Sequence, residues 1–358
     1  MKIFKTTSLM LALLAGSLTY AQDELVTEEE VAVEVTEEKP SFSVSGSIDT
    51  YYRSNEFAPN TSFSNLPGFA LGMANIVLSY EGEKSGFVAD LVYGPRGAEA
   101  VFGSNLSIGG DEYLAGSSNI VNQLYAYYNV NDKLTLTLGN FNTFLGCEVI
   151  SPVANFNYST SYMFSYGPFS HTGFKADYTV SDNVSIMVAI MNATDETEAN
   201  YSDTSTFGAQ LGLYGQYINF LSGDDYTQFD FTGGFNISEK FFLGINATST
   251  ELTADANFSG IALYPQYTVS DSFSLGIRGE LFSETNGGAD ALYTGALSGS
   301  LEDADNTSLT ITGSYTNGDF ILKPEFRIDS ASANIYSKNA TDFSDNLASF
   351  VVAAIYAF

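Results

Sequence analysis

Cysteine, histidine and tryptophan are almost missing from this chain of 358 residues. It contains one cysteine, one histidine and no tryptophan. A single cysteine, Cys147, excludes an intrachain disulfide. With His171 as its one histidine, the chain cannot build a His-rich metal site or a CxxC centre. We therefore expect no metal site and no cofactor.

Basic residues are scarce as well. Lys and Arg number 13 against 42 Asp and Glu, which gives a formal net charge of −29. Such a charge repels nucleic acid and anionic surfaces, so the composition argues against a nucleic-acid partner. Charged residues together make up only 15 % of the chain. Ordinary soluble proteins have about 25 %.

After residue 21 the chain lacks any apolar run near the ~20 residues that a spanning helix needs. Residues 1–21 carry Lys2 and Lys5, the apolar stretch SLMLALLAGSL and small residues before Gln22, the pattern of a cleaved secretory signal peptide. Residues 22–41 are rich in carboxylates and are typical of a disordered, self-repelling periplasmic segment. An exported chain with 28 Phe and 23 Tyr but no helical spans is either a secreted β-protein or an outer-membrane β-barrel.

What the chain does have, from Ser41 onward, is alternation of apolar and polar residues. The stretch LTLTL at 134–138 places its three leucines on one face and its two threonines on the other, and 184–190 and 320–328 repeat this pattern. Side chains of a strand alternate between faces, so the pattern predicts an all-β domain over 42–358.

Two kinds of connection separate the predicted strands. Short Asn/Ser/Asp/Gly-rich turns recur in YNVNDKLTL (128–136), YTVSDNVSI (178–186) and YTVSDSFSL (267–275), and turns of this chemistry join antiparallel hairpins. Between them lie long polar segments, at 94–118, 145–170, 284–306 and 330–344. Short periplasmic turns and long extracellular loops are typical of a single-chain transmembrane barrel, whose strand number is even.

We predict about sixteen strands; fourteen or eighteen also fit, because the short segments within 205–226 are hard to delimit. The predicted strands are 42–54, 69–81, 86–93, 119–130, 134–144, 171–180, 184–191, 205–214, 216–222, 226–237, 241–250, 258–269, 273–283, 306–315, 320–329 and 346–358.

In a spanning barrel the apolar face contacts lipid and the alternate face lines a wet lumen. Charged residues between outward-facing Phe, Ile and Leu are therefore predicted to line the pore: Asp49, Arg53, Lys175, Asp177, Arg278, Glu280, Lys323, Glu325, Arg327 and Asp329. Aromatic residues at strand ends predict interfacial girdles: Tyr80, Tyr93, Tyr127, Tyr128, Tyr178, Tyr267 and Phe273. In a soluble sandwich the charges would instead form the solvent face, but the signal peptide and the aromatic residues favour the membrane.

The last residues, FVVAAIYAF at 350–358, predict the strand that closes the barrel against 42–54. Phe350, Val352, Ala354, Tyr356 and Phe358 share one parity and are expected to face lipid. Tyr356 and Phe358 also resemble the C-terminal signal that the barrel assembly machinery reads.

Catalytic patterns are scarce. His171 could serve an outer-membrane hydrolase, but no GxSxG context supports this, so we expect no enzyme. The acidic stretches GGDE (109–112), GDD (223–225) and EDAD (302–305) contain oxygen ligands of the kind that Ca²⁺ prefers, without the spacing of a defined calcium loop. Together, their negative electrostatic potential would attract cations to the mouth of a barrel.

Residues 138–186 carry a family resemblance. A Gly-Asn-Phe strand end at 139–141 leads to Gly146 and Glu148, then to an aromatic-rich loop, Pro168 and the His-Thr-Gly return at 171–173. This segment resembles the OmpL-like β-barrel porins of the BBP2 type, with Cys147 where an aromatic residue is more usual. The resemblance implies a solute channel in the outer membrane of a Gram-negative bacterium.

We therefore expect a water-filled porin for passive diffusion of small hydrophilic solutes, with a mild preference for cations or neutral solutes. The 145–170 segment is the candidate constriction, through Glu148, Tyr158, Tyr162, Tyr166 and His171. The expected partners are outer-membrane lipids, small solutes and the barrel assembly machinery. Trimers are common among porins, but no residue argues for a homo-trimer here. The alternative is a plugged barrel acting as an adhesin or surface scaffold.

Overall fold

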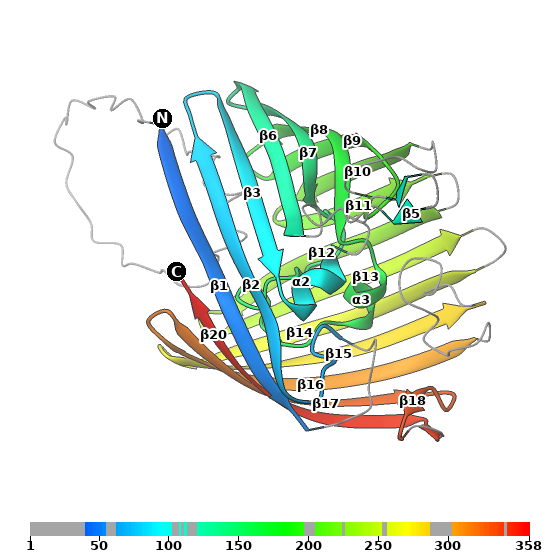
Figure 1. Ribbon diagram of the computed structural model, residues 1–358. Coiled ribbons are helices and arrows are strands. Elements are labelled where there is room, and N and C mark those ends of the chain that lie inside the picture. Colours follow the sequence, from blue (N-terminus) through cyan, green and yellow to red (C-terminus); the bar gives the residue numbers. More distant parts are fainter. Residues whose placement is uncertain are drawn as a thin grey trace.

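The computed structural model describes residues 40–54, 62–101, 107–108, 111–112, 120–196, 205–223, 226–252, 256–286, 303–339 and 342–358. Sixteen antiparallel strands close into one barrel, in which each strand pairs with the next and β20 pairs with β1 (Figure 1). Closure leaves no sheet edge, so the wall strands satisfy one another's backbone N–H and C=O groups, as a bilayer requires.

The barrel strands agree with the sixteen predicted ones to within about three residues at each end. They are β1 (Ser41–Arg53), β2 (Gly68–Glu81), β3 (Ser85–Tyr93), β6 (Val121–Asn131), β7 (Leu134–Asn142), β8 (Ser170–Ser181), β9 (Val184–Met191), β10 (Thr206–Leu213), β11 (Gln216–Ser222), β12 (Tyr226–Ser238), β13 (Phe241–Leu252), β14 (Asn257–Ser270), β15 (Phe273–Thr285), β16 (Ala304–Asn317), β17 (Phe320–Ala331) and β20 (Asn346–Ala357). The hairpin within 205–226 is therefore confirmed.

Connections of two kinds alternate around the barrel, as predicted. At the end where β1 begins and β20 ends, tight turns join the strands, such as 132–133, 182–183 and 271–272. The other end carries the long connections 94–120 and 143–169 (Figure 1). These contain the short helices α2 (Pro95–Ala100) and α3 (Tyr162–Tyr166) and the hairpin β4 (Ser107–Ile108) with β5 (Asp111–Glu112); a second hairpin, β18 (Tyr336–Ser337) with β19 (Phe343–Ser344), follows β17.

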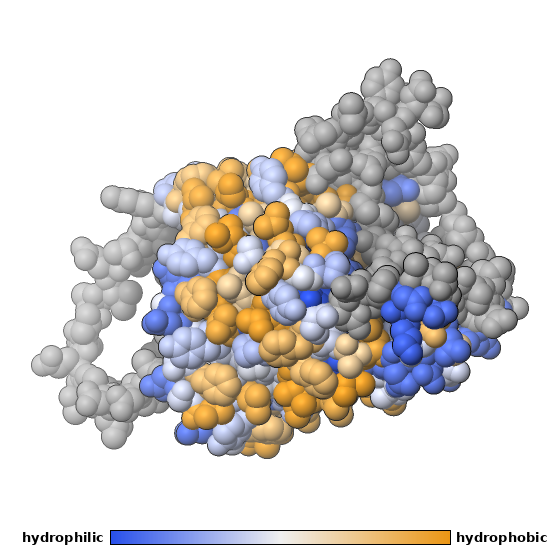
Figure 2. Space-filling view, turned by 60° about the horizontal axis from the view of Figure 1, so that its bottom comes forward, coloured by the Kyte–Doolittle hydropathy of each residue, from blue (hydrophilic) through white to orange (hydrophobic). Residues whose placement is uncertain are grey.

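The two faces of the wall differ in polarity. On β8, Phe174 and Tyr178 point outward and are 44 % exposed, while His171 points inward and is fully buried. Figure 2 shows the outer face of the wall, where apolar residues cover the middle and hydrophilic residues lie toward the ends. Among the described residues, no helix is long and apolar enough to span a membrane.

One aromatic residue of the predicted girdles faces the other way. Tyr93, Tyr128, Tyr178 and Tyr267 are 44–49 % exposed on the outer face. Tyr127 instead lies on the inner face, where its ring packs over Gly86, its partner on β3. The reason is parity, because adjacent strand residues such as Tyr127 and Tyr128 must point to opposite faces.

The seam of the barrel joins the two ends of the described chain. β1 pairs with β20 from Ser47–Ala357 to Arg53–Val351. Beyond it, Gly46 and Phe358 exchange two backbone hydrogen bonds of 3.0 Å each. Phe350, Tyr356 and Phe358 are exposed on the outer face, as predicted, whereas Val351, Ala353 and Ile355 are buried inside. The predicted signal peptide (1–21) and nearly all of the acidic segment (22–41) lie outside the described residues.

Candidate functional site: a loop inside the barrel

Residues 143–169, called the inner loop below, connect β7 to β8 and run inside the barrel. Local features set its course. Gly146 has a φ of +73°, which side chains with a Cβ rarely adopt. Asn155 hydrogen-bonds with both the N–H and the C=O of Val149. Ser161 caps α3 by accepting a hydrogen bond from the N–H of Phe164.

Carboxylates of the barrel wall accept hydrogen bonds from the backbone N–H groups of the inner loop. Glu325 on β17 accepts from Tyr158 at 2.7 Å and from Ser159 at 3.0 Å. Glu280 on β15 accepts from Tyr162 and Met163, both at 2.9 Å, which are the first N–H groups of α3. A helix start leaves such N–H groups unpaired and favours negative charge. Each carboxylate thus fixes two consecutive residues of the loop.

Basic side chains bind the carbonyl groups of the same segment. Arg278 on β15 donates to the carbonyl oxygens of Ser159 at 2.6 Å and Thr160 at 2.9 Å. Arg327 on β17 also donates to the Thr160 carbonyl, at 2.7 Å. Two more cations hold neighbouring carbonyls: Lys323 donates to Pro152 and Asn155, and Arg96 of α2 donates to Tyr158.

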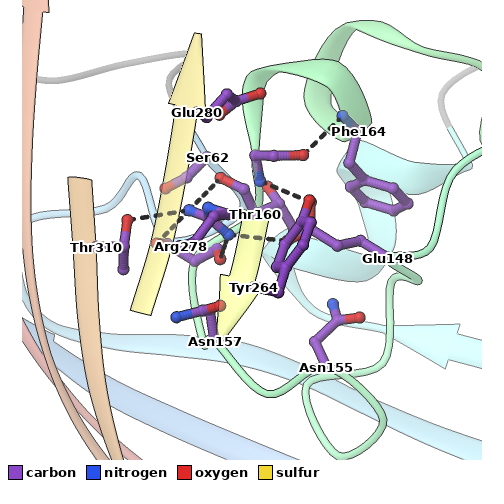
Figure 3. A network of polar contacts seen from close by, with 12 residues as sticks. Ser62, Glu148, Asn155, Asn157, Thr160, Phe164, Tyr264, Arg278, Glu280 and Thr310 are labelled. Carbon is purple, nitrogen blue, oxygen red and sulfur yellow. Dashed lines mark hydrogen bonds and ion pairs between the residues drawn. The ribbon is translucent and has the colours of Figure 1, made fainter. Parts of the chain in front are cut away.

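One ion pair ties a loop side chain to the wall. Arg278 Nη1 lies 2.8 Å from Glu148 Oε1, and the other Glu148 oxygen accepts from the Ser161 N–H at 2.9 Å. Figure 3 shows Arg278 at the centre of this network, between Thr310 of β16 and the inner loop. Burying an ion pair is tolerated where further hydrogen bonds satisfy both partners. Here they satisfy Glu148 and both terminal nitrogens of Arg278, while Arg278 Nε has no hydrogen-bond partner among the described residues.

Aromatic rings fill the space between the loop and the wall. Tyr158 packs in a cluster with Tyr51 of β1 and with Val351, Ala353 and Ile355 of β20. Its hydroxyl donates to Asp49 at 2.5 Å. This packing explains why the inner face of β20 is apolar, an irregularity of the sequence pattern that alternation alone does not explain. Tyr162 and Tyr166 of α3 stack on each other; Tyr166 also stacks on Phe282 of β15, and Tyr162 lies tilted against the same ring.

Two further carboxylates hold the ends of the inner loop. Near its start, Asp230 on β12 accepts from the Gly146 N–H at 3.0 Å and from the amides of Asn219 and Asn246. At its end, Asp195 accepts from the N–H groups of Phe169 at 2.7 Å and Ser170 at 2.9 Å. Burial raises the pKa of the Asp195 carboxyl to about 7, against the opposing effect of these two hydrogen bonds.

Residues 41–358 match the protein family described as "Putative beta-barrel porin-2, OmpL-like". The chain belongs to this porin family. The match covers the whole barrel, and the resemblance seen in residues 138–186 is thereby confirmed. It places the protein in the outer membrane of a Gram-negative bacterium. A search of curated proteins gave no match.

Solved structures of outer-membrane proteins share this fold. The outer membrane channel DcaP of Acinetobacter baumannii superposes with a TM-score of 0.55 at 11 % identity, over 89 % of this porin and 98 % of DcaP. OmpTdeltaL8, a loop L8 deletion mutant of the outer membrane protein OmpT of Vibrio cholerae, gives 0.51 at 12 % identity, over 90 % and 100 %. At such identities the likeness concerns the fold alone.

The structure divides the ten predicted pore-lining charges of this porin into two groups. Eight are at most 4 % exposed, and six of those bind the inner loop directly: Asp49, Arg278, Glu280, Lys323, Glu325 and Arg327. Asp329 pairs with Arg327, and Arg53 donates to the Asn65 carbonyl. The second group consists of Lys175 and Asp177, which form an ion pair of 2.9 Å. Their side chains are partly exposed, at 14 % and 24 %.

The predicted constriction residues of the porin lie within or beside the inner loop, in separate clusters. Glu148, Tyr158, Tyr162 and Tyr166 belong to it and are buried against the wall. His171 is fully buried on β8, where Nε2 lies 3.0 Å from Thr143 Oγ1 and the ring packs near Phe144. Whether these residues constrict a pore stays a prediction.

Sequence reasoning missed several residues that hold the inner loop. Asp230 had a usable signal, since it is a carboxylate within an alternating strand, in QFDF. Arg96 and Asp195 lie in connections without periodicity, and no sequence pattern points to them. In the described part of the chain, no group of three or more His, Cys, Asp or Glu could hold a metal ion.

Proposed function

We propose that this porin forms a water-filled channel for passive diffusion of small hydrophilic solutes, with a mild preference for cations or neutral solutes. The observation that carries the proposal is the inner loop, which hydrogen bonds hold to strands β12, β15, β17 and β1 inside a sixteen-stranded wall. A barrel of sixteen strands is wide enough for an aqueous channel. A loop fixed within it narrows such a channel without needing any catalytic group.

Solvent access inside the barrel supports this proposal. The side chains of Lys175 and Asp177 are partly exposed on the inner face of β8. Cys147, within the inner loop, is exposed as well. The buried wall charges, by contrast, act through the loop and fix the width of the passage. Channel selectivity follows from pore radius and wall charge, and the net charge of −29 favours cations over anions.

The proposal is tested by measuring ion conductance and solute release. Refolded protein in planar bilayers is expected to give steady conductance with a cation preference, and proteoliposomes are expected to release small neutral sugars. Strong anion selectivity would contradict the proposed preference.

The dense anchoring of the inner loop favours one alternative, a plugged barrel that acts as an adhesin or surface scaffold. Such a barrel would show no steady conductance and no sugar release, although it would insert and fold normally. The same bilayer recording therefore separates the two functions.

We also propose that the protein is not an enzyme. His171→Ala is expected to leave conductance nearly unchanged, whereas an outer-membrane hydrolase acting through this histidine would lose its activity. Residues 1–21 remain a proposed signal peptide and 22–41 a proposed acidic periplasmic segment. The assembly machinery is the proposed reader of Tyr356 and Phe358. A homo-trimer is the proposed assembly.

A further inference from the structure

One pattern of outward-facing residues recurs at the ends of several strands. Strands β6, β8, β12 and β14 run toward the barrel end that carries the tight turns, as β20 does (Figure 1). Each of these five ends carries a triplet on the outer face: a small residue or proline, then an aromatic residue, then a β-branched aliphatic residue or, after β20, a phenylalanine. The triplets are Ala126, Tyr128, Val130; Ala176, Tyr178, Val180; Gly233, Phe235, Ile237; Pro265, Tyr267, Val269; and Ala354, Tyr356, Phe358. The proposed assembly signal at the end of β20 thus resembles four strand ends within the chain.

The aromatic residues of the five triplets lie in equivalent places. Their side chains are all 44–49 % exposed on the outer face. Each is the register partner of an aliphatic residue on a neighbouring strand: Tyr128 of Leu136, Tyr178 of Ile186, Phe235 of Leu243, Tyr267 of Leu275, and Tyr356 of Ile48. The pairing of β20 with β1, which closes the barrel, therefore repeats a pairing that each of the four internal hairpins contains.

The third residue of each internal triplet lies beyond the aromatic ring, next to the turn. Each is followed by Asn or Ser and then by Asp or Glu, and the strand register shifts at each of them. The four residues are 41–62 % exposed: Val130, Val180, Ile237 and Val269. An interfacial girdle explains the aromatic rings. It does not explain an aliphatic residue on the water side of each ring.

The barrel fold does not require the triplet. Strand β10 also ends at a tight turn, and its last outward residues are Ala209, Leu211 and Leu213, without an aromatic residue. Strand β16 has Gly313 and Tyr315 but ends with the polar Asn317. The complete triplet is therefore a property of particular strands, and it calls for a role that those strands share with β20.

We propose that the ends of β6, β8, β12 and β14 are additional binding sites for the barrel assembly machinery, which recognises the triplet in each of them. The inference rests on the proposed role of Tyr356 and Phe358 as an assembly signal and extends that role to four internal strands. Before the next strand has paired, such an end has an unpaired backbone edge with side chains at alternate positions. A partner strand pairs with an edge of this kind, and pockets for the alternate side chains provide specificity.

The next strand of the chain then takes the place of the machinery. When β9 pairs with β8, Ile186 comes to lie opposite Tyr178, and the backbone edge of β8 on that side is occupied. Formation of each hairpin thus releases the strand end from its partner. The same exchange takes place last at β20, where Ile48 of β1 lies opposite Tyr356.

Peptide competition tests the proposal on the full-length chain. Unfolded protein is added to proteoliposomes that contain the purified assembly machinery, together with a peptide of residues 171–181. We expect this peptide to slow assembly severalfold, as a peptide of residues 346–358 does. The control peptide exchanges Tyr178 and Thr179, which keeps the composition and moves the ring to the other face of the strand. It should not compete.

A pair of variants separates recognition from packing in the finished barrel. Tyr178→Ala and Ile186→Ala each remove an outer side chain from the same cross-strand pair. Each variant is assembled by the machinery and, separately, folded without it in detergent micelles. Tyr178→Ala is expected to lower the ratio of assisted to unassisted folding rates severalfold, and Ile186→Ala to leave it unchanged. Tyr178→Phe should keep the wild-type ratio, because Phe235 occupies the equivalent place on β12.

The outcomes distinguish the internal sites from the terminal signal. If the 346–358 peptide competes and the 171–181 peptide does not, the internal sites are overturned and the role of Tyr356 and Phe358 stands. If neither peptide competes, the terminal signal is overturned together with the internal sites. Equal rate ratios for Tyr178→Ala and Ile186→Ala would show that the ring of Tyr178 serves packing alone.

Discussion

Arg278 and Glu148 are 130 residues apart in the sequence, and their side chains meet in a 2.8 Å ion pair inside the barrel. Arg278 is fully buried and also holds the carbonyls of Ser159 and Thr160. A single wall residue thus binds the inner loop at a side chain and at two points of its backbone.

Arg278→Met is therefore expected to release the inner loop. Removing one partner of a buried ion pair costs about 3–5 kcal/mol, because the other charge stays buried without compensation. We expect larger and noisier single-channel conductance and faster proteolytic cleavage within 143–169. Lys175→Met, which breaks a partly exposed pair, is the matched control and should cost at most about 1 kcal/mol. Equal conductance and protease resistance in both variants would contradict the anchoring role.

Two glycines of β15 offer a second test of loop packing. A Cβ added at Gly276 would overlap the ring of Phe156 in the inner loop, whereas one added at Gly279 would meet nothing within 4 Å. Gly276→Val is expected to displace the loop at a cost of about 1–3 kcal/mol, as overpacking does. Gly279→Val, on the outer face of the same strand, should be nearly neutral. The check is to compare the single-channel conductance of the two variants, and the temperature at which each loses the electrophoretic mobility of the folded barrel.

The contribution of Asp195, at the end of the inner loop, to the stability of the protein depends on pH in a defined direction. Burial raises the pKa of Asp195 to about 7, above the ~3.9 of an unfolded aspartate. Its contribution to stability is thus complete below pH ~4 and is lost as the pH rises through about 7, on the order of 4 kcal/mol. Asp195→Asn keeps an oxygen for the N–H groups of Phe169 and Ser170 but does not titrate.

Denaturation measured at several pH values between 4 and 8 checks this. Wild type should lose stability relative to Asp195→Asn as the pH rises. Parallel curves for the two proteins would show that Asp195 titrates normally.

Phe358 and Phe350 provide a matched pair at the seam. Both are exposed on the outer face and both extend the pairing of β20 with β1, Phe350 through Ser54 and Phe358 through Gly46. Phe358 differs in that its ring packs beside the glycine with which it pairs. Phe358→Asp is expected to reduce the yield of assembled barrel in outer membranes severalfold, and Phe350→Asp much less. Similar yields for the two variants would contradict the special role of Phe358 in assembly.

Much of the barrel was predictable because its determinants are local. Alternation such as that at 134–138 defines strand and face together, and the tight turns set the pairing of neighbours. The prediction for Tyr127 is wrong, because a position at a strand end predicts the membrane interface while the parity of the residue decides which face it joins. The inner face of β20 looked irregular because its partner, Tyr158, lies nearly 200 residues away in the sequence.

The candidate site was only half predictable, for a related reason. Charges such as Arg278 and Glu280 could be placed on the inner face by parity. Their partners could not be inferred, because most of them are backbone groups of a Ser- and Asn-containing loop without periodicity. The sequence does not show which backbone carbonyl, such as that of Ser159, will accept a hydrogen bond. Inward-facing charges that bind a loop therefore have the same sequence pattern as inward-facing charges that contact water.

The position of Tyr158 has a consequence for the order of assembly. Its apolar surroundings combine Tyr51 of the first strand with Val351, Ala353 and Ile355 of the last. That surface does not exist until β1 and β20 have paired. The inner loop therefore cannot reach its final packing in an open sheet, and ring closure and loop docking form one cooperative event. A channel built in this way acquires its final width only when the ring is complete, and a change that opens the seam also frees the loop.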